Sequence, residues 1–85
     1  NFPNPFNAQT TIAYRLSGPA TVKLTLFNAM GQIVKRLVNE TQAKGEHTVI
    51  WNGTDAANRP LGSGMYFYTL DTGAVQETRR LLLLK

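Results

Sequence analysis

Hydrophobic and polar residues alternate along much of this 85-residue chain, a pattern typical of β-strands that bury one face. The alternation is clearest at residues 10–16, 21–27, 47–51 and 64–72. In the first stretch Ile12, Tyr14 and Leu16 share one face, and Arg15 lies on the other. Residues 17–20, which include the turn-forming residues 17–19, separate the first two stretches, and this predicts that the two form a β-hairpin.

Four other segments are assigned from their length, composition and turn-forming residues. Residues 32–38 have an apolar spacing that fits a short helix as well as a strand, but their length and β-branched side chains favour a strand. Residues 39–45 are polar and predict a loop. Residues 52–63 are dense in Asn, Asp, Gly and Pro, so we expect a long connection that crosses between sheets. Residues 74–84 predict a final strand.

Together these elements predict an all-β fold, an immunoglobulin-like antiparallel β-sandwich of about seven strands. Residues 10–84 form the sandwich, and residues 1–7, with two alternating prolines, form an extended N-terminal segment. At this length one core must supply all the stability, so residues 1–85 are expected to be a single domain. Apolar residues make up 42% of the sequence and charged residues 16%, a balance typical of a compact fold.

Charge and hydropathy narrow the classes of partner. The net charge is +4, but the basic residues are scattered and not interleaved with aromatic rings, so no nucleic-acid partner is expected. The longest apolar run, Leu81 to Leu84, is far shorter than the roughly 20 residues that span a bilayer, so the chain is predicted not to be membrane-spanning. The absence of cysteine excludes disulfides and thiolate chemistry.

Candidate catalytic and metal-binding residues are few. His47, the only histidine, has no neighbouring nucleophile or further metal ligand in the sequence, so a structural role is expected. Residues 52–55 and Asn58 place several oxygen atoms in one loop, but with one carboxylate; turn hydrogen bonds are favoured, and calcium binding stays open. We therefore predict no catalytic residue, no metal and no cofactor, and hence no enzyme.

Aromatic residues suggest an alternative function. Tyr66, Phe67 and Tyr68 lie in one predicted strand, and a flat aromatic strip on a β-sandwich can bind sugars. Consecutive strand residues point to opposite faces, so at most Tyr66 and Tyr68 share a surface, and core packing explains them better. A carbohydrate-binding or structural immunoglobulin-like accessory module of a secreted enzyme is kept as the alternative.

Several segments together resemble a known family. They are residues 1–7, 26–34, 51–55, 64–68 and the basic, apolar end 79–85. In this order they resemble the type A C-terminal sorting domain of the type IX (Por) secretion system of Bacteroidetes and related bacteria, and the resemblance covers essentially the whole chain. Residues 51–55 and 64–66 are also similar to the immunoglobulin-like domain of the flagellar hook-capping protein.

The type IX resemblance implies that the domain is a sorting signal. It would direct an upstream cargo domain of the same chain through the periplasm and across the outer membrane, to be secreted or held at the cell surface. The implied partners are the outer-membrane translocon and a sortase-like peptidase. By position, the residues that match the family's motifs are Pro3, Pro5, Gly64, Tyr66, Arg79, Arg80 and Lys85.

The last predicted strand has more apolar residues than one face of a sandwich requires. Alternation places two of the four leucines 81–84 toward the core and the other two outward, but does not decide which two. At a sheet edge such a strand would let a partner add a strand, with Leu82 and Leu84 as the predicted docking pair and the basic residues attracting the partner. The alternative is a strand that the N-terminal segment buries on its second face.

Overall fold

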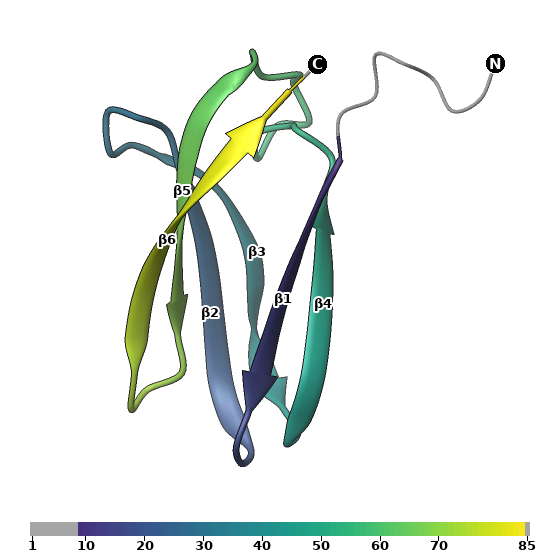
Figure 1. Ribbon diagram of the computed structural model, residues 1–85, viewed down its shortest axis with the longest axis vertical. Coiled ribbons are helices and arrows are strands. Elements are labelled where there is room, and N and C mark those ends of the chain that lie inside the picture. The colour runs from purple at the N-terminus through teal and green to yellow at the C-terminus, as the bar shows by residue number, and fades with distance from the viewer. Residues whose placement is uncertain (1–8, 85) are drawn as a thin grey trace, which may run out of the picture.

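The computed structural model describes residues 9–84, and every regular element within them is a β-strand (Figure 1). The strands are β1 (Thr10–Leu16), β2 (Ala20–Phe27), β3 (Ile33–Gln42), β4 (Gly45–Trp51), β5 (Gly64–Asp71) and β6 (Gln76–Leu83). β1 and β4 form one antiparallel sheet, and the other strands form a second in the order β3-β2-β5-β6. The predicted all-β, immunoglobulin-like sandwich is confirmed, with six strands among the described residues.

The core lies between the two sheets and contains inward side chains from every strand. Its buried apolar residues are Ile12, Leu16, Val22, Leu24, Leu26, Val34, Val38, Trp51, Tyr66, Leu81 and Leu83. Trp51 of β4 packs edge-on against Tyr66 of β5, with ring centroids 5.2 Å apart, so an aromatic contact joins the two sheets. Burying an apolar side chain of leucine size contributes about 1.5–3 kcal/mol.

The predicted hairpin between the first two strands is wrong. β1 pairs with β4, whereas β2 pairs with β3 and β5, so residues 17–19 carry the chain from one sheet to the other. The buried residues of β1 and β2 belong to opposite sheets and meet across the core, whereas a hairpin would place them on one face of a single sheet.

β3 is longer and less regular than the sequence pattern indicates. It continues to Gln42 by pairing with β2, so the loop predicted at residues 39–45 is mostly strand. Two shifts of register against β2 leave Val34 and Leu37 as extra residues, which makes them β-bulges. Because bulges interrupt the two-residue period, the apolar spacing of this segment also fits a helix.

The end of the sandwich at which β6 terminates also carries two connections. They are the turn of residues 28–32 and the loop of residues 52–63, which crosses between the sheets as predicted (Figure 1). No helix that could cross a bilayer occurs among residues 9–84.

Candidate functional site

β6 forms one edge of the four-stranded sheet, and its two faces differ sharply. Its register against β5 is continuous over the whole strand, without a bulge. Leu81 and Leu83 are 8% and 0% exposed, whereas Leu82 and Leu84 are 53% and 69% exposed. The inner leucines hold the strand in place, and the outer leucines are presented to solvent.

Leu82 belongs to an apolar patch on the outer face of the four-stranded sheet. Phe27 is paired with both Ile33 and Phe67, and Met65 is paired with Leu82. Ile33 and Met65 are 56% and 40% exposed, and the two phenylalanines are partly buried. We call Phe27, Ile33, Met65, Phe67 and Leu82 the outer patch. Contiguous exposed apolar surface of this kind is typical of protein–protein contacts.

The rest of the same face is polar. In the next row Thr25 is paired with Arg36 and Thr69, and Thr69 is paired with Thr78. The hydroxyls of Thr69 and Thr78 lie 3.3 Å apart and form a hydrogen bond. The outer patch is therefore confined to the end of the face next to the 28–32 turn. Sequence reasoning missed it, although Phe27, Met65 and Phe67 stand at positions where strict alternation requires polar residues.

The border of the outer patch is basic. Arg80 of β6 is paired with Phe67, and Arg36 of β3 is paired with Thr25 in the next row. None of the residues paired with the patch across these strands is acidic. The patch thus suits a partner that offers apolar side chains with carboxylates beside them.

β3, the other edge of this sheet, is partly covered at the end next to the outer patch. Its bulges interrupt the regular row of backbone N–H and C=O groups. The 52–63 loop lies against it, since the Ala56 N–H donates to the Val34 carbonyl oxygen at 3.1 Å and Lys35 Nζ donates to Thr54 Oγ1 at 3.2 Å. Bulges and loop cover both prevent a sheet edge from pairing with another chain.

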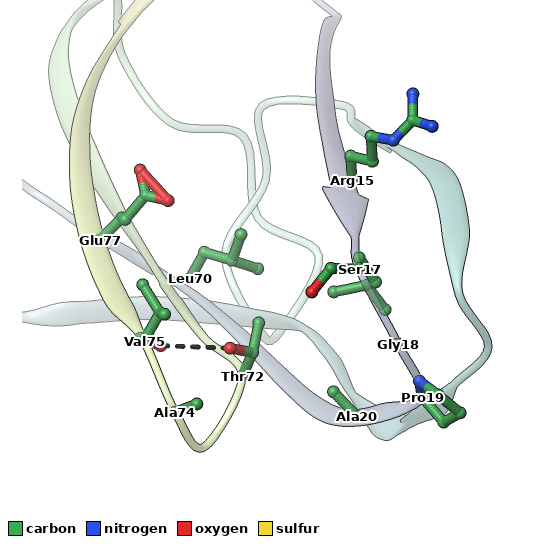
Figure 2. Close-up of a pocket in the computed structure, with 11 residues that line it drawn as sticks. Arg15, Ser17, Gly18, Pro19, Ala20, Leu70, Thr72, Ala74, Val75 and Glu77 are labelled. Carbon is green, nitrogen blue, oxygen red and sulfur yellow. Dashed lines mark hydrogen bonds between the residues drawn. The ribbon is translucent and has the colours of Figure 1, made fainter.

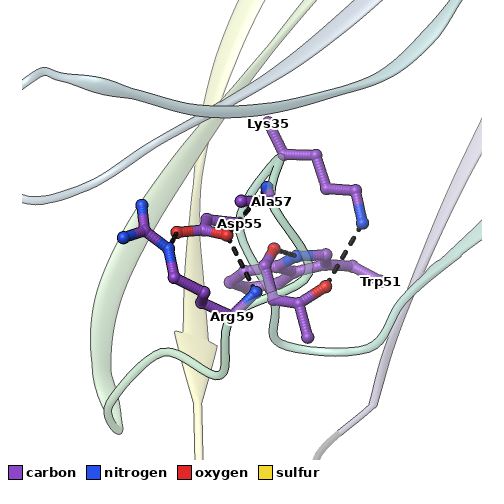
Figure 3. A network of polar contacts seen from close by, with 6 residues as sticks. Lys35, Trp51, Asp55, Ala57 and Arg59 are labelled. Atoms are coloured by element: carbon purple, nitrogen blue, oxygen red, sulfur yellow. Dashed lines mark hydrogen bonds and ion pairs between the residues drawn. The ribbon is translucent and has the colours of Figure 1, made fainter.

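Asp55 holds this loop in shape (Figure 3). Its Oδ1 accepts the backbone N–H groups of Ala57 and Arg59 at 2.9 Å each, and its Oδ2 accepts Arg59 Nε at 3.0 Å. The backbone hydrogen bond from Arg59, more than any other contact, lowers the pKa of the Asp55 carboxyl. Turn hydrogen bonds and the ion pair with Arg59 thus account for both carboxylate oxygens. No cluster of three or more metal-ligating side chains occurs among residues 9–84.

Gly64 and Tyr66, predicted as partner-binding residues, lie in the framework of the fold. Tyr66 is buried, and its hydroxyl donates to the Gly62 carbonyl oxygen at 2.7 Å. Gly64 has φ +155°, a backbone conformation that favours glycine. Since Trp51 is buried as well, neither ring is exposed for stacking on a sugar.

The structure separates the predicted basic residues. Arg80 lies beside the outer patch, whereas Arg79 lies on the opposite side of β6, with its guanidinium 3.2 Å from the Glu77 carboxylate. Pro3, Pro5 and Lys85 lie outside the described residues. Of the predicted partner-binding residues, Arg80, Leu82 and Leu84 come together at one edge.

A groove of about 310 Å³ lies between the end of β1 and the β5–β6 hairpin (Figure 2). Its lining includes Arg15 and Glu77, but Figure 2 shows the Arg15 guanidinium turned away from it. That guanidinium forms an exposed ion pair with Glu46 at 3.4 Å. With one carboxylate and no histidine in its lining, the groove lacks the paired groups of general acid–base catalysis.

His47 has structural contacts. Its ring stacks on Tyr14 with centroids 5.5 Å apart, and its Nε2 lies 2.8 Å from the Ala43 carbonyl oxygen. The Tyr14 hydroxyl donates to Gln42 Oε1, and burial raises the pKa of this hydroxyl. These contacts tie the two-stranded sheet to the end of β3.

Comparison with known proteins identifies the family. A sequence profile of the FlgD Ig-like domain matches residues 4–75. The fold matches a crystal structure of FlgD from P. aeruginosa with a TM-score of 0.69 and 21% sequence identity. The match covers 88% of this chain and 58% of that one, so the chain spans less than two thirds of that structure. No curated protein matches the chain in sequence.

These findings overturn the type IX interpretation, because the matching profile is a FlgD Ig-like domain and no type IX sorting domain matches. Three expectations that rested on this interpretation are therefore also wrong. They are the sorting function, the translocon and sortase-like peptidase as partners, and delivery to the cell surface. The alternative of an accessory module is not better supported. The similarity of residues 51–55 and 64–66 to the immunoglobulin-like domain of the flagellar hook-capping protein agrees with the profile match. These residues build the contact of Trp51 with Tyr66 and the Asp55 turn, which reflect the fold, so they could not distinguish the two resemblances. The chain belongs to the FlgD Ig-like domain family.

Proposed function

We propose that this chain is the immunoglobulin-like domain of a flagellar hook-capping protein, in which residues 1–85 act as one protein-binding domain without catalytic activity. Family membership supports the proposal, since FlgD is the flagellar hook-capping protein. Its place of action would be the flagellar hook. Its partners would be proteins of the hook assembly.

The outer patch is the observation that carries this proposal. If covering its five side chains recovers about half of the 1.5–3 kcal/mol that full burial of each contributes, the gain is roughly 4–8 kcal/mol. Association of two proteins costs on the order of 4–15 kcal/mol in lost freedom. The patch alone therefore supports a weak contact, and a durable one requires further interactions beside it.

A catalytic role has less support. The Asp55 carboxylate accepts hydrogen bonds that shape its loop, and His47 is engaged with Tyr14 and Ala43. The outer patch, in contrast, lies outside the core between the two sheets.

The proposal is tested in the organism that encodes the chain, with the domain in its full-length protein. Deleting residues 9–84 should abolish hook assembly, seen as missing hooks in electron micrographs. Replacing both Met65 and Phe67 by lysine should cause the same defect at normal protein level, because lysine places charge within the outer patch. Ile50→Lys is the matched control, since Ile50 is exposed on β4, away from the patch, and hooks should form normally.

The two contrary outcomes have different meanings. Normal hooks after the deletion would contradict the proposed hook-capping function. Normal hooks after the double lysine replacement would contradict the role of the outer patch.

A further inference from the structure

The outer patch reaches the edge of the sheet at β6. Building on the proposed function, we propose that the partner adds an extended strand to the free edge of β6. On its outer face this strand carries a carboxylate opposite Arg80 and apolar side chains opposite Leu82 and Leu84. The partner is thus an extended acidic and apolar segment of a protein chain.

The backbone of β6 is suited to strand addition. Its register is continuous, it contains no proline, and β5 is its only neighbour in the sheet among residues 9–84. Its other side pairs with no strand among the described residues, so it offers N–H and C=O groups at regular spacing to an added strand. β3 has bulges and a loop at the corresponding positions. The profile match ends at residue 75, before β6, so this inference rests on the structure of the strand itself.

Strand addition supplies the further interactions that the outer patch requires. Backbone hydrogen bonds give affinity, and side chains at alternate positions give specificity. Side chains directly opposite each other on neighbouring strands interact, so an added strand would extend the rows that already cross the sheet. One row ends at Arg80 beside Phe67, and the next ends at Leu82 beside Met65.

A second copy of this chain is a poorer occupant. When two β6 strands pair antiparallel about a twofold axis perpendicular to the sheet, outer side chains meet outer side chains. The outer residues of β6 and its continuation are Gln76, Thr78, Arg80, Leu82 and Leu84. None is acidic, so no register of this pair places a carboxylate opposite Arg80, and one register places two Arg80 side chains opposite each other. Charge complementarity favours an acidic partner.

Synthetic peptides test the inference with the full 85-residue chain. The probe is a threonine-rich peptide of strand length with one glutamate and two valines at alternate positions, made in both chain directions. The control peptide has lysine in place of the glutamate. Calorimetric titration should show the glutamate peptide binding about tenfold tighter in at least one direction, because opposite charges across neighbouring strands attract and like charges repel.

Charge reversal at two adjacent arginines sharpens the test. Arg80→Glu should reverse the preference, so that the lysine peptide binds tighter. Arg79→Glu makes the same change of charge on the opposite side of β6, and the preference for the glutamate peptide should persist. A preference unchanged by Arg80→Glu, or equally reversed by Arg79→Glu, would overturn the inference.

N-methylated peptides distinguish strand addition from side-chain docking. In an added strand only alternate peptide amides face β6. Methylating that set should abolish binding, and methylating the other set should preserve it. Equal binding of both methylated peptides would overturn strand addition, as would dimerisation of the chain through β6 that no peptide displaces, seen by sedimentation.

Failure of this inference is distinguishable from failure of the proposed function. If no peptide binds β6 but the double lysine replacement of Met65 and Phe67 still abolishes hooks, strand addition is wrong and the binding role of the outer patch stands. If the peptides bind as expected and hooks form without the domain, the hook-capping function is wrong and strand addition stands.

Discussion

The two edge strands of the four-stranded sheet differ in how accessible their outward-facing backbone N–H and C=O groups are. β3 has two bulges, and the 52–63 loop covers part of it through the hydrogen bond from Ala56 to Val34. β6 keeps a continuous register and has no such cover among residues 9–84. Since a free edge is where another chain can pair, this difference makes β3 the closed edge and β6 the open edge.

The outer patch shows that exposed apolar side chains alone do not make an edge available. Ile33 on the closed edge and Leu82 on the open edge are both more than half exposed. Only Leu82 lies on a strand whose backbone is regular and is not covered by any other part of residues 9–84. Side chains decide which partner a sheet edge selects, and the backbone decides whether the partner can add a strand at all.

The largest expected effect separates the two faces of the open edge. Leu83→Ala should lower the free energy of unfolding by about 2–5 kcal/mol, because the side chain is fully buried in the core. Leu82→Ala, the same change one residue earlier, should cost less than about 1 kcal/mol, because that side chain is half exposed. Denaturant unfolding of both variants measures the difference. Equal losses would mean that β6 does not have the orientation described above.

A smaller effect is expected from opening the closed edge. Asp55→Ala removes the acceptors of the Ala57 and Arg59 backbone N–H groups and should loosen the loop over β3. Hydrogen exchange of the Ala56 amide, which is bonded to the Val34 carbonyl, should become faster. Asp55→Asn keeps an acceptor oxygen and should fall between wild type and the alanine variant. Unchanged exchange in the alanine variant would show that Asp55 does not maintain the cover.

The same carboxylate should give the closed edge a pH dependence. The backbone hydrogen bond from Arg59 lowers the pKa of Asp55 below its ordinary value of 3.8, so folding favours the charged form. The resulting stability is fully present above the pKa of the unfolded chain and is lost as the pH falls through the lower pKa of the folded state. Relative to its intrinsic rate, hydrogen exchange of the Ala56 amide should become faster below about pH 4 in the wild type. The Asp55→Asn variant should show no such increase at this pH. The same increase in both proteins would show that a titrating group other than Asp55 causes it.

The smallest effect is expected at Arg79. Its ion pair with Glu77 is exposed on both sides, so Arg79→Ala should change the free energy of unfolding by less than about 0.5 kcal/mol. Thermal unfolding of the variant beside the wild type measures this. A clear loss of stability would show that this ion pair, and not only the inner leucines, holds β6 in place.

Local pattern predicted burial well where the strands are regular. The alternation of β1 and β2 identified Ile12, Leu16 and the three core residues of β2, because the pleat of a strand is a local property. It did not identify strand neighbours, because the pairing of β1 with β4 depends on contacts between distant segments. It also misjudged β3, since bulges arise from pairing with β2 and leave no periodic trace.

The candidate site likewise has features that the local sequence pattern predicts and features that depend on strand pairing. Alternation showed that two leucines of the last strand face outward, but only the core contacts of Leu81 and Leu83 decide which two. The outer patch depends on pairing Phe27 with Phe67 and Met65 with Leu82, which no local pattern contains. The family was misassigned because the motif around Trp51 encodes a fold that both resemblances share, so it could not favour the hook-capping family over the sorting domain.

Amide hydrogen exchange of the two edge strands, with and without the glutamate peptide, shows which edge accepts a strand. Bound peptide should slow exchange at alternate amides of β6, those on its free side, and leave the amides of β3 unchanged. Slowing at β3, or no slowing at β6 under conditions in which the peptide is bound, would contradict the assignment of β6 as the open edge.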